Sequence, residues 1–165
     1  MHKLTHKVSL LMIVLTALTF SGCSSKKPKT DVGAIPSAAD ADVNALGDSD
    51  SGRAAGLQTI HFDYDSYILT GETRRILEQN TALLKEKGNL NIQIEGHCDE
   101  RGGIQYNIAL GEKRANAVRR FLIDNGIPGE RVTTISFGKE RPINPASNEE
   151  AWNQNRRANF VVTSQ

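Results

Sequence analysis

Residues 94–118 read IEGHCDERGGIQYNIALGEKRANAV, and this stretch predicts a strand, a loop and a helix in succession. The strand follows from alternation, which extends back to residue 90 and separates two faces. One face carries Leu90, Ile92, Ile94 and Cys98, and the other carries Asn91, Gln93, Glu95, His97 and Asp99. The glycine pair at 102–103 then allows the chain to turn before the helix.

A helical period of 3.6 residues predicts the helix over residues 107–125. Its apolar stripe consists of Leu110, Ala117, Val118, Phe121 and Leu122, and Gly126 with Pro128 ends it. Arg114 lies four residues from both Leu110 and Val118, so its side chain is predicted to point inward. A buried charge is costly unless it is paired, so we expect Asp99, a bound anion, or both in turn to satisfy it.

The remaining patterns predict further strands and helices around this unit. Strands are expected over residues 60–64, 132–137 and 159–163, and helices over 71–87 and 149–154. The helix over 71–87 would bury Ile76, Leu77, Leu83 and Leu84. The alternating order predicts a two-layer α/β (α+β) fold, with a mixed sheet of about four strands and helices packed mainly on one face.

Residues 1–22 have the pattern of a bacterial signal peptide. A basic start is followed by an apolar run over residues 8–20, which is shorter than the roughly 20 residues that a membrane span needs. Ser21 and Gly22 precede Cys23, and this arrangement resembles a lipobox, which implies lipidation of Cys23. Ser24 in place of Asp then implies sorting to the outer membrane, where two or more acyl chains give lasting anchorage.

Residues 24–56 are predicted to be a flexible linker, because they contain no aromatic residue and few large apolar ones. As a coil this segment would span roughly 30 Å. The folded domain is therefore expected over residues 57–165. Lipidation of Cys23 leaves Cys98 as the one remaining cysteine, which we interpret as a small buried hydrophobic residue.

Overall composition excludes several classes of partner. The net charge is +1 with acidic and basic residues mixed, and only 5% of residues are aromatic. Neither a basic patch for nucleic acid nor a platform for stacked bases is predicted. No pattern for a cofactor is present, so none is expected.

The motif Asp99, Leu110-Gly111, Arg114-Ala115 and Val118 resembles the signature of OmpA-like peptidoglycan-binding domains. The wording GHxDERG and YNxxLGExRANAV is similar, within that family, to peptidoglycan-associated lipoproteins (Pal). The similarity covers about residues 60–162. It implies an OmpA-like fold and a non-enzymatic, lipid-anchored protein that binds peptidoglycan through meso-diaminopimelate of the stem peptide.

The resemblance also implies which residues form the site. Asp99 would accept a hydrogen bond from the ligand ammonium and Arg114 would clamp its carboxylate. Arg157 corresponds to a late N-x-R contact, with Arg156 as a second candidate for that role. Asn107, Leu110 and Gly111 would line the pocket, and Asp63 and Asp65 would form its rim. The similarity to Pal further implies TolB and the other Tol proteins as partners, with a role in envelope integrity and cell division.

Other interpretations use some of the same residues. His61, Asp63, His97 and Asp99 form two His-x-Asp pairs at strand ends, which could bind zinc in a periplasmic hydrolase. The inward Arg114 argues against a cation there, so no metal is predicted. A third possibility is a lipoprotein that binds only other proteins. Glu100 and Arg101 are interpreted as a rim ion pair that contributes little energy.

Overall fold

The computed structural model describes residues 46–165, in which five strands form one sheet accompanied by three α-helices and a short 3-10 helix. The strands follow the order β1-β5-β3-β4, and β2 also pairs with β5. The strands are β1 (Gly47–Asp48), β2 (Ile60–His61), β3 (Asn91–His97), β4 (Val132–Gly138) and β5 (Arg157–Ser164). The helices are α1 (Gly71–Glu86), α2 (Ile104–Asp124), the 3-10 helix η1 (Gly129–Arg131) and α3 (Glu149–Asn155).

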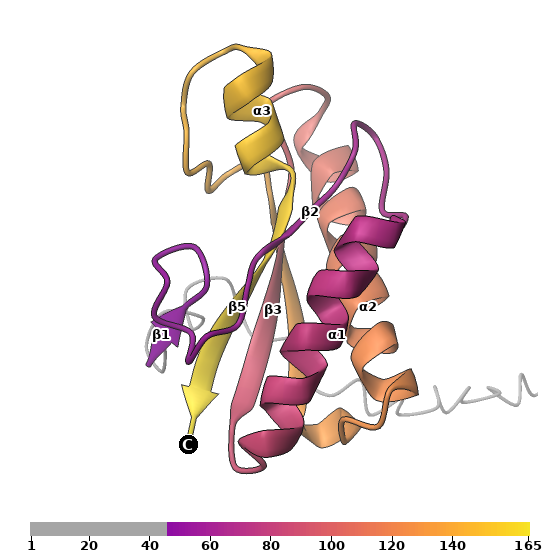
Figure 1. Cartoon of the computed structure of the whole chain (residues 1–165). Coiled ribbons are helices and arrows are strands. Elements are labelled where there is room, and N and C mark those ends of the chain that lie inside the picture. The colour runs from indigo at the N-terminus through magenta and orange to yellow at the C-terminus, as the bar shows by residue number, and fades with distance from the viewer. Residues whose placement is uncertain (1–45) are drawn as a thin grey trace, which may run out of the picture. The chain divides into compact units, whose positions relative to one another are not determined.

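The sheet is mixed, as the sequence predicts. β3 runs parallel to β4 through the α2 crossover and antiparallel to β5, so β3 lies at the centre. Helices α1 and α2 lie side by side against one face of the sheet, and α3 lies beyond the end of the strands (Figure 1). The predicted two-layer arrangement with helices mainly on one face is therefore confirmed.

One hydrophobic core fills the space between the two long helices and the sheet. The expected inward positions Leu77 and Leu84 of α1 and Val118 and Leu122 of α2 are fully buried. Ile92, Ile94 and Phe160 face them from the central strands. The other face of β3 carries Gln93, Glu95 and His97, and these polar residues are buried as well.

The predicted strand over residues 60–64 is shorter than expected. β2 comprises only Ile60–His61, although the backbone N–H of Phe62 still bonds to the carbonyl of Arg156 before the chain leaves the sheet. The following residues form a loop that leads to α1. This loop supplies two of the backbone carbonyls of the site described below.

The predicted boundary of the linker at residue 56 is wrong, because residues 46–56 belong to the folded domain. β1 pairs antiparallel with β5, and Ala54 is fully buried. Polar side chains supply much of the attachment: Asp50 Oδ2 accepts from Arg157 Nε at 2.7 Å, and Ser49 Oγ donates to Asn159 Oδ1 at 2.8 Å. A segment with few large apolar residues is thus ordered by strand pairing and specific hydrogen bonds. This also brings the sheet to five strands instead of about four.

Several predictions fall on residues 1–45, which lie outside the described part of the chain. They concern the signal peptide over residues 1–22, Cys23 and most of the linker. Within residues 46–165, no helix has the length and apolar character needed to cross a membrane.

Two glycines allow α2 to pack directly on the sheet. A Cβ atom added to Gly96 in β3 would lie 1.9 Å from the carbonyl oxygen of Gly111 in α2. A Cβ atom on Gly111 would lie 2.3 Å from Ser136 Oγ and 2.8 Å from the Gly96 carbonyl. Backbone atoms cannot give way as a flexible side chain can, so only glycine fits at this contact.

We expect Gly96→Ala to destabilise the domain by about 2 kcal/mol or more, because α2 must move away from β3. Denaturant unfolding of residues 46–165 measures this change. Gly103→Ala is the matched control, since an added Cβ there meets no atom within 4 Å and the backbone φ is −75°. Equal stability of the two variants would contradict the close approach.

Candidate functional site

A pocket of about 160 Å³ opens where β3 ends and α2 begins. The loop after β2 and the loop between β3 and α2 form its walls, and the first turns of α2 form its base. Its lining residues are Tyr64, Asp65, Cys98, Asp99, Arg101, Gly102, Tyr106, Asn107, Leu110 and Arg114. The sequence motif thus converges on one concave site.

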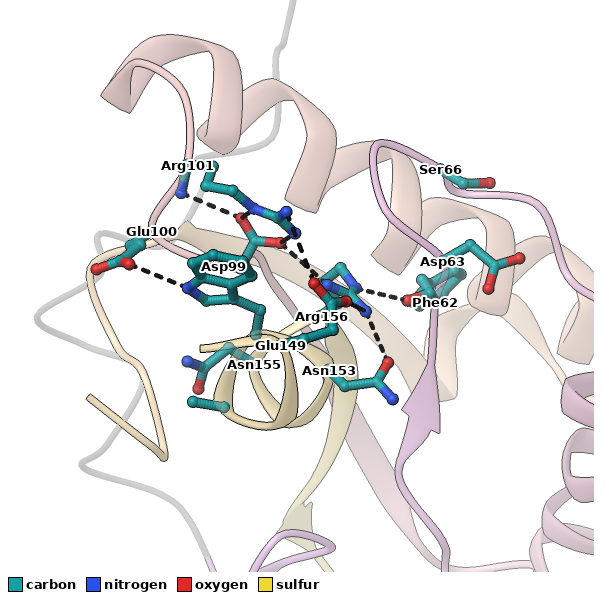
Figure 2. A network of polar contacts seen from close by, with 12 residues as sticks. Phe62, Asp63, Ser66, Asp99, Glu100, Arg101, Glu149, Asn153, Asn155 and Arg156 are labelled. Carbon is teal, nitrogen blue, oxygen red and sulfur yellow. Dashed lines mark hydrogen bonds and ion pairs between the residues drawn. The ribbon is translucent and has the colours of Figure 1, made fainter. Parts of the chain in front are cut away.

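Asp99 is buried at the side of this pocket, with a carboxylate that accepts four hydrogen bonds. Oδ1 accepts from the backbone N–H and the Nε of Arg101, at 3.1 and 3.2 Å. Oδ2 accepts from Arg101 Nη2 at 2.6 Å and from Arg156 Nη1 at 3.3 Å (Figure 2). A carboxylate offers about four lone-pair positions, so the protein itself uses the full accepting capacity of Asp99.

Arg101 is held between two aromatic rings as well as by Asp99. Its guanidinium carbon lies 4.1 Å from the ring centroid of Tyr64 and 4.1 Å from that of Trp152. Trp152 is oriented by its Nε1, which donates to Glu100 Oε1 at 3.0 Å. The interpretation of Glu100 and Arg101 as a rim ion pair is therefore wrong, because each has a separate partner.

Arg114 is only 1% exposed, which confirms that it points inward. Of the expected partners, Asp99 does not pair with Arg114, since no ion pair joins the two within the described residues, and a bound anion stays a prediction. Its Nε, Nη1 and Nη2 instead donate to the carbonyls of Ser66, His97 and Asp63, at 2.8, 2.7 and 3.1 Å. These carbonyls accept hydrogen bonds from the guanidinium but carry no net charge, so its positive charge is not cancelled. Two of its five N–H groups remain for a ligand. Burial lowers the pKa of Arg114 from its ordinary value.

The structure separates the two candidate arginines at the start of β5. Arg156 bonds to Asp99 and to the Phe62 carbonyl, so it holds the Asp99 carboxylate in place without lining the pocket itself. Arg157 points to the other face of the sheet, where it pairs with Asp50. The expectation that Arg157 contacts the ligand is wrong because consecutive residues of a strand face opposite sides.

The other predicted site residues divide into two groups. Asp65, Asn107 and Leu110 line the pocket; Asp65 accepts from the Tyr106 hydroxyl, and Asn107 Nδ2 donates to the Arg101 carbonyl at 2.8 Å. Asp63 and Gly111 do not line it. Asp63 contributes its carbonyl while its side chain is exposed, and Gly111 serves the contact of α2 with β3.

Sequence reasoning missed three aromatic residues and underestimated Arg101. Tyr64 and Tyr106 line the pocket, and Trp152 reaches its edge from α3 by stacking on Arg101. The position of Arg101 two residues after Asp99 was a usable signal for a local pair. No sequence pattern indicates Trp152, because it lies more than 50 residues away and reaches the site only through the fold.

The two histidines do not form the metal site that the hydrolase alternative requires. His97 is 1% exposed, its Nε2 lies 3.4 Å from Glu95 Oε2, and its ring stacks on Phe137. His61 Nδ1 lies 3.3 Å from the carbonyl of Asn153. Within the described residues, no three His, Cys, Asp or Glu side chains are grouped so that they could hold a metal ion.

Cys98 forms part of the pocket wall as a buried thiol. It is 3% exposed, and its Sγ donates to the Asn107 carbonyl at 3.3 Å. Burial raises its pKa to about 11, although the nearby Arg114 charge acts in the opposite direction. The thiol therefore stays protonated at neutral pH and is a poor nucleophile, as expected for a small buried hydrophobic residue.

Comparison with known proteins supplies the family. The OmpA family model matches residues 61–156. A peptidoglycan-associated lipoprotein of Mesorhizobium japonicum is 38% identical over 154 residues, covering 90% of this chain and 88% of that protein. The corresponding protein of Pseudomonas aeruginosa is 38% identical over 149 residues, covering 82% and 85%. The chain belongs to the peptidoglycan-associated lipoproteins of the OmpA family.

Solved structures agree with this assignment. The crystal structure of the peptidoglycan-associated lipoprotein from Burkholderia pseudomallei is 41% identical, with a TM-score of 0.61, covering 63% of this chain and 88% of that one. The C-terminal domain of Helicobacter pylori MotB has a TM-score of 0.62 at 20% identity, covering 67% and 87%, and shows the same fold. The OmpA-like fold is thus confirmed. Peptidoglycan-associated lipoproteins are not enzymes, which removes the hydrolase alternative.

The protonation of Asp99 in this lipoprotein is set by its partners. Burial by itself raises the pKa of the carboxyl group, but the hydrogen bonds and charge of Arg101, together with Arg156, outweigh it and lower the pKa. A lowered folded-state pKa stabilises the domain above the unfolded value of about 3.9. That contribution is lost as the pH falls through the folded-state value.

We expect the free energy of unfolding to fall below about pH 5 and to continue falling under pH 3.9, with Asp99 contributing to this decline. Asp99→Asn should be less stable by about 1–3 kcal/mol at pH 7, because buried guanidinium donors lose a charged acceptor. The gap between variant and wild type should narrow toward pH 2. Urea unfolding from pH 2 to pH 7 tests this, with Asp124→Asn at the exposed end of α2 as control. A difference in the free energy of unfolding that does not change with pH would contradict the ionisation assigned to Asp99.

Proposed function

We propose that the domain binds peptidoglycan non-covalently, by taking the free end of a meso-diaminopimelate side chain into the pocket of about 160 Å³. The names of the relatives, peptidoglycan-associated lipoproteins, support the class of ligand. The observation that carries the proposal is that one pocket contains a buried carboxylate, Asp99, and a buried guanidinium, Arg114, that form no ion pair with each other. Such a site suits a zwitterion.

The two charges of the ligand end match the two charged residues. Diaminopimelate carries an ammonium and a carboxylate on the same terminal carbon. Arg114 has two N–H groups that are not used by the carbonyls of Ser66, His97 and Asp63, and these can bind the carboxylate. Because the three carbonyls hold the guanidinium in place, little conformational entropy is lost on binding.

Asp99 receives the ammonium only by exchanging one of its four hydrogen bonds. The Arg101 side chain is 30% exposed, whereas that of Arg156 is 5% exposed, so Arg101 is the partner that can move. Stacking on Tyr64 and Trp152 then keeps the displaced guanidinium near the pocket. The ligand ammonium replaces one cation with another, and Asp99 remains paired throughout.

The anchoring half of the proposal concerns residues 1–45. Cys23 would carry the lipid that holds the protein in the outer membrane, with the domain in the periplasm. Residues 24–45 would then form the linker between lipid and domain. With one end in the membrane and the other on the cell wall, the protein would tie these two layers together.

The finer assignment to the Tol-Pal system belongs to the same proposal. TolB and other Tol proteins would bind this domain and compete with peptidoglycan for part of its surface. The support for this is family membership. A role in envelope integrity and cell division would follow from that exchange.

Calorimetric titration of residues 46–165 with muropeptides should detect binding of the meso-diaminopimelate form. The lysine form should bind at least tenfold more weakly, since lysine lacks the second carboxylate and leaves the free N–H groups of Arg114 unpaired. Arg114→Lys should lose most of the binding to the first form and most of the discrimination. Equal binding of both muropeptides by the wild-type domain would refute the binding of the ligand carboxylate by Arg114.

Arg119→Lys provides the matched control for Arg114→Lys. Arg119 also lies on α2 and also donates to backbone carbonyls, those of Val132 and Gly129, at 2.9 and 3.2 Å. It does not line the pocket. A loss of binding that is equal in both variants would indicate general damage to α2 and would not support the site.

We expect Cys23→Ser, expressed as the full chain in a Gram-negative host, to move from the membrane fraction to the soluble periplasmic fraction. The change removes the thiol that would be acylated. Mass spectrometry of the wild-type N-terminus checks the acyl chains directly, and Cys98→Ser serves as the cysteine control. A Cys23→Ser protein that still sediments with outer membranes would contradict lipid anchoring through Cys23.

A further inference from the structure

A second hollow, of about 110 Å³, lies beside the first pocket. The segment between β4 and α3 forms one side, and Trp152 of α3 forms the other. Its lining includes Glu100, Lys139, Pro142, Pro145, Ala146 and Trp152. Nothing in the function proposed above uses it.

The two pockets share a wall. Trp152 stacks on Arg101, which lines the first pocket, with 4.1 Å between the guanidinium carbon and the ring centroid. Lys139 Nζ donates at 2.8 Å to the carbonyl of Gly102, which also lines the first pocket. Figure 2 shows Glu100 and Arg101 extending to different sides of Asp99. Glu100 lines the second hollow, and Arg101 lines the first pocket. A ligand in the first pocket therefore needs only a short extension to enter the second.

The second hollow offers one cation, one anion and an apolar floor. Lys139 Nζ is fixed by the carbonyls of Glu100 and Gly102, at 3.1 and 2.8 Å, which leaves one of its three N–H donors unused. The Glu100 carboxylate accepts from Trp152 through Oε1, and its Oε2 has no bond within the described residues. The prolines and the tryptophan ring supply the apolar surface.

The size of the hollow restricts what it can hold. Its volume of about 110 Å³ is smaller than the 160 Å³ of the first pocket, which favours a small terminal group as its ligand. A pyranose ring with its substituents has about twice as many heavy atoms as an alanine residue. The side-chain amides of Asn144 and Asn155 are already used by bonds within the loop and between the loop and α3.

We propose that this hollow binds a carboxyl-terminal alanine that follows diaminopimelate in the stem peptide. The alanine N–H would donate to Glu100, its carboxylate would accept from Lys139, and its methyl group would pack on the prolines and Trp152. This inference rests on the proposed function, because the first pocket must hold the diaminopimelate end. With both pockets occupied, the domain would distinguish stem peptides by their length as well as by their chemistry.

The test compares two muropeptides that share the disaccharide and differ at one position. One has a tripeptide stem that ends at meso-diaminopimelate, and the other has a tetrapeptide stem that ends with alanine. Wild-type residues 46–165 should bind the tetrapeptide about fourfold more tightly or better, which is the gain expected from burying one methyl group. Equal affinities overturn the inference.

Two variants locate the effect. Lys139→Gln removes the cation, and Ala146→Leu fills the hollow from its exposed rim. Ala146→Leu should bind the tripeptide as wild type does and should lose the preference for the tetrapeptide. Lys139→Gln also frees the Gly102 carbonyl of the first pocket, so its readout is the ratio of tetrapeptide to tripeptide affinity, which should fall to about one. Lys113→Gln is the control, because Lys113 lies on α2 against Tyr67 and lines neither pocket. A preference that survives in both variants overturns the assignment to this hollow.

The outcome for this inference can be separated from that for the proposed function. Failure of the tripeptide muropeptide to bind refutes the diaminopimelate site itself. Tripeptide binding without a gain from alanine leaves that site intact and refutes only the second one. Inhibition of both muropeptides by free N-acetylglucosamine, with equal affinities, would assign the hollow to a sugar and would also overturn the alanine inference.

Discussion

The buried guanidinium of Arg114 is the constraint on which the site depends. A charged group with 1% exposure must find partners inside the protein, and the partners here are three backbone carbonyls. Two belong to the loop after β2 and one to the end of β3, so a single side chain from α2 joins three segments. Because carbonyls are neutral, the positive charge stays available to a ligand. A direct ion pair with Asp99 would have cancelled it.

Asp99 complements this arrangement from the other side of the pocket. Its four hydrogen bonds come from two arginines of very different exposure, one buried and one stacked between aromatic rings. The buried carboxylate is thereby kept ionised while one of its donors can be exchanged. In the proposed complex the Arg114 guanidinium is already positioned for the ligand carboxylate, whereas the ammonium must displace one Arg101 hydrogen bond from Asp99. The same stacked arginine connects this pocket to the hollow beside Trp152.

The face of the sheet opposite the long helices follows a different principle. It is buried but polar: Glu95 Oε2 accepts from Asn159 Nδ2 at 2.9 Å and lies near His97, and Arg157 pairs with Asp50. These groups need partners once the face is covered. Residues 46–56 supply several of them, which explains why a segment without a hydrophobic pattern is part of the fold.

Local pattern was sufficient to predict the strand at 90–98, the inward direction of Arg114, both long helices and the layer order, because periodicity and burial depend on nearby residues. The local sequence also contained the motif by which the family was identified. Pairing choices depended on the tertiary structure: Asp99 with Arg101 and Arg156 instead of Arg114, Arg157 with Asp50, and Trp152 over Arg101. These partners lie on different elements, and geometry decides among several arginines that a sequence alone makes equally plausible. The fold also determined that residues 46–56 are ordered, since their stability comes from β5 and not from their own composition.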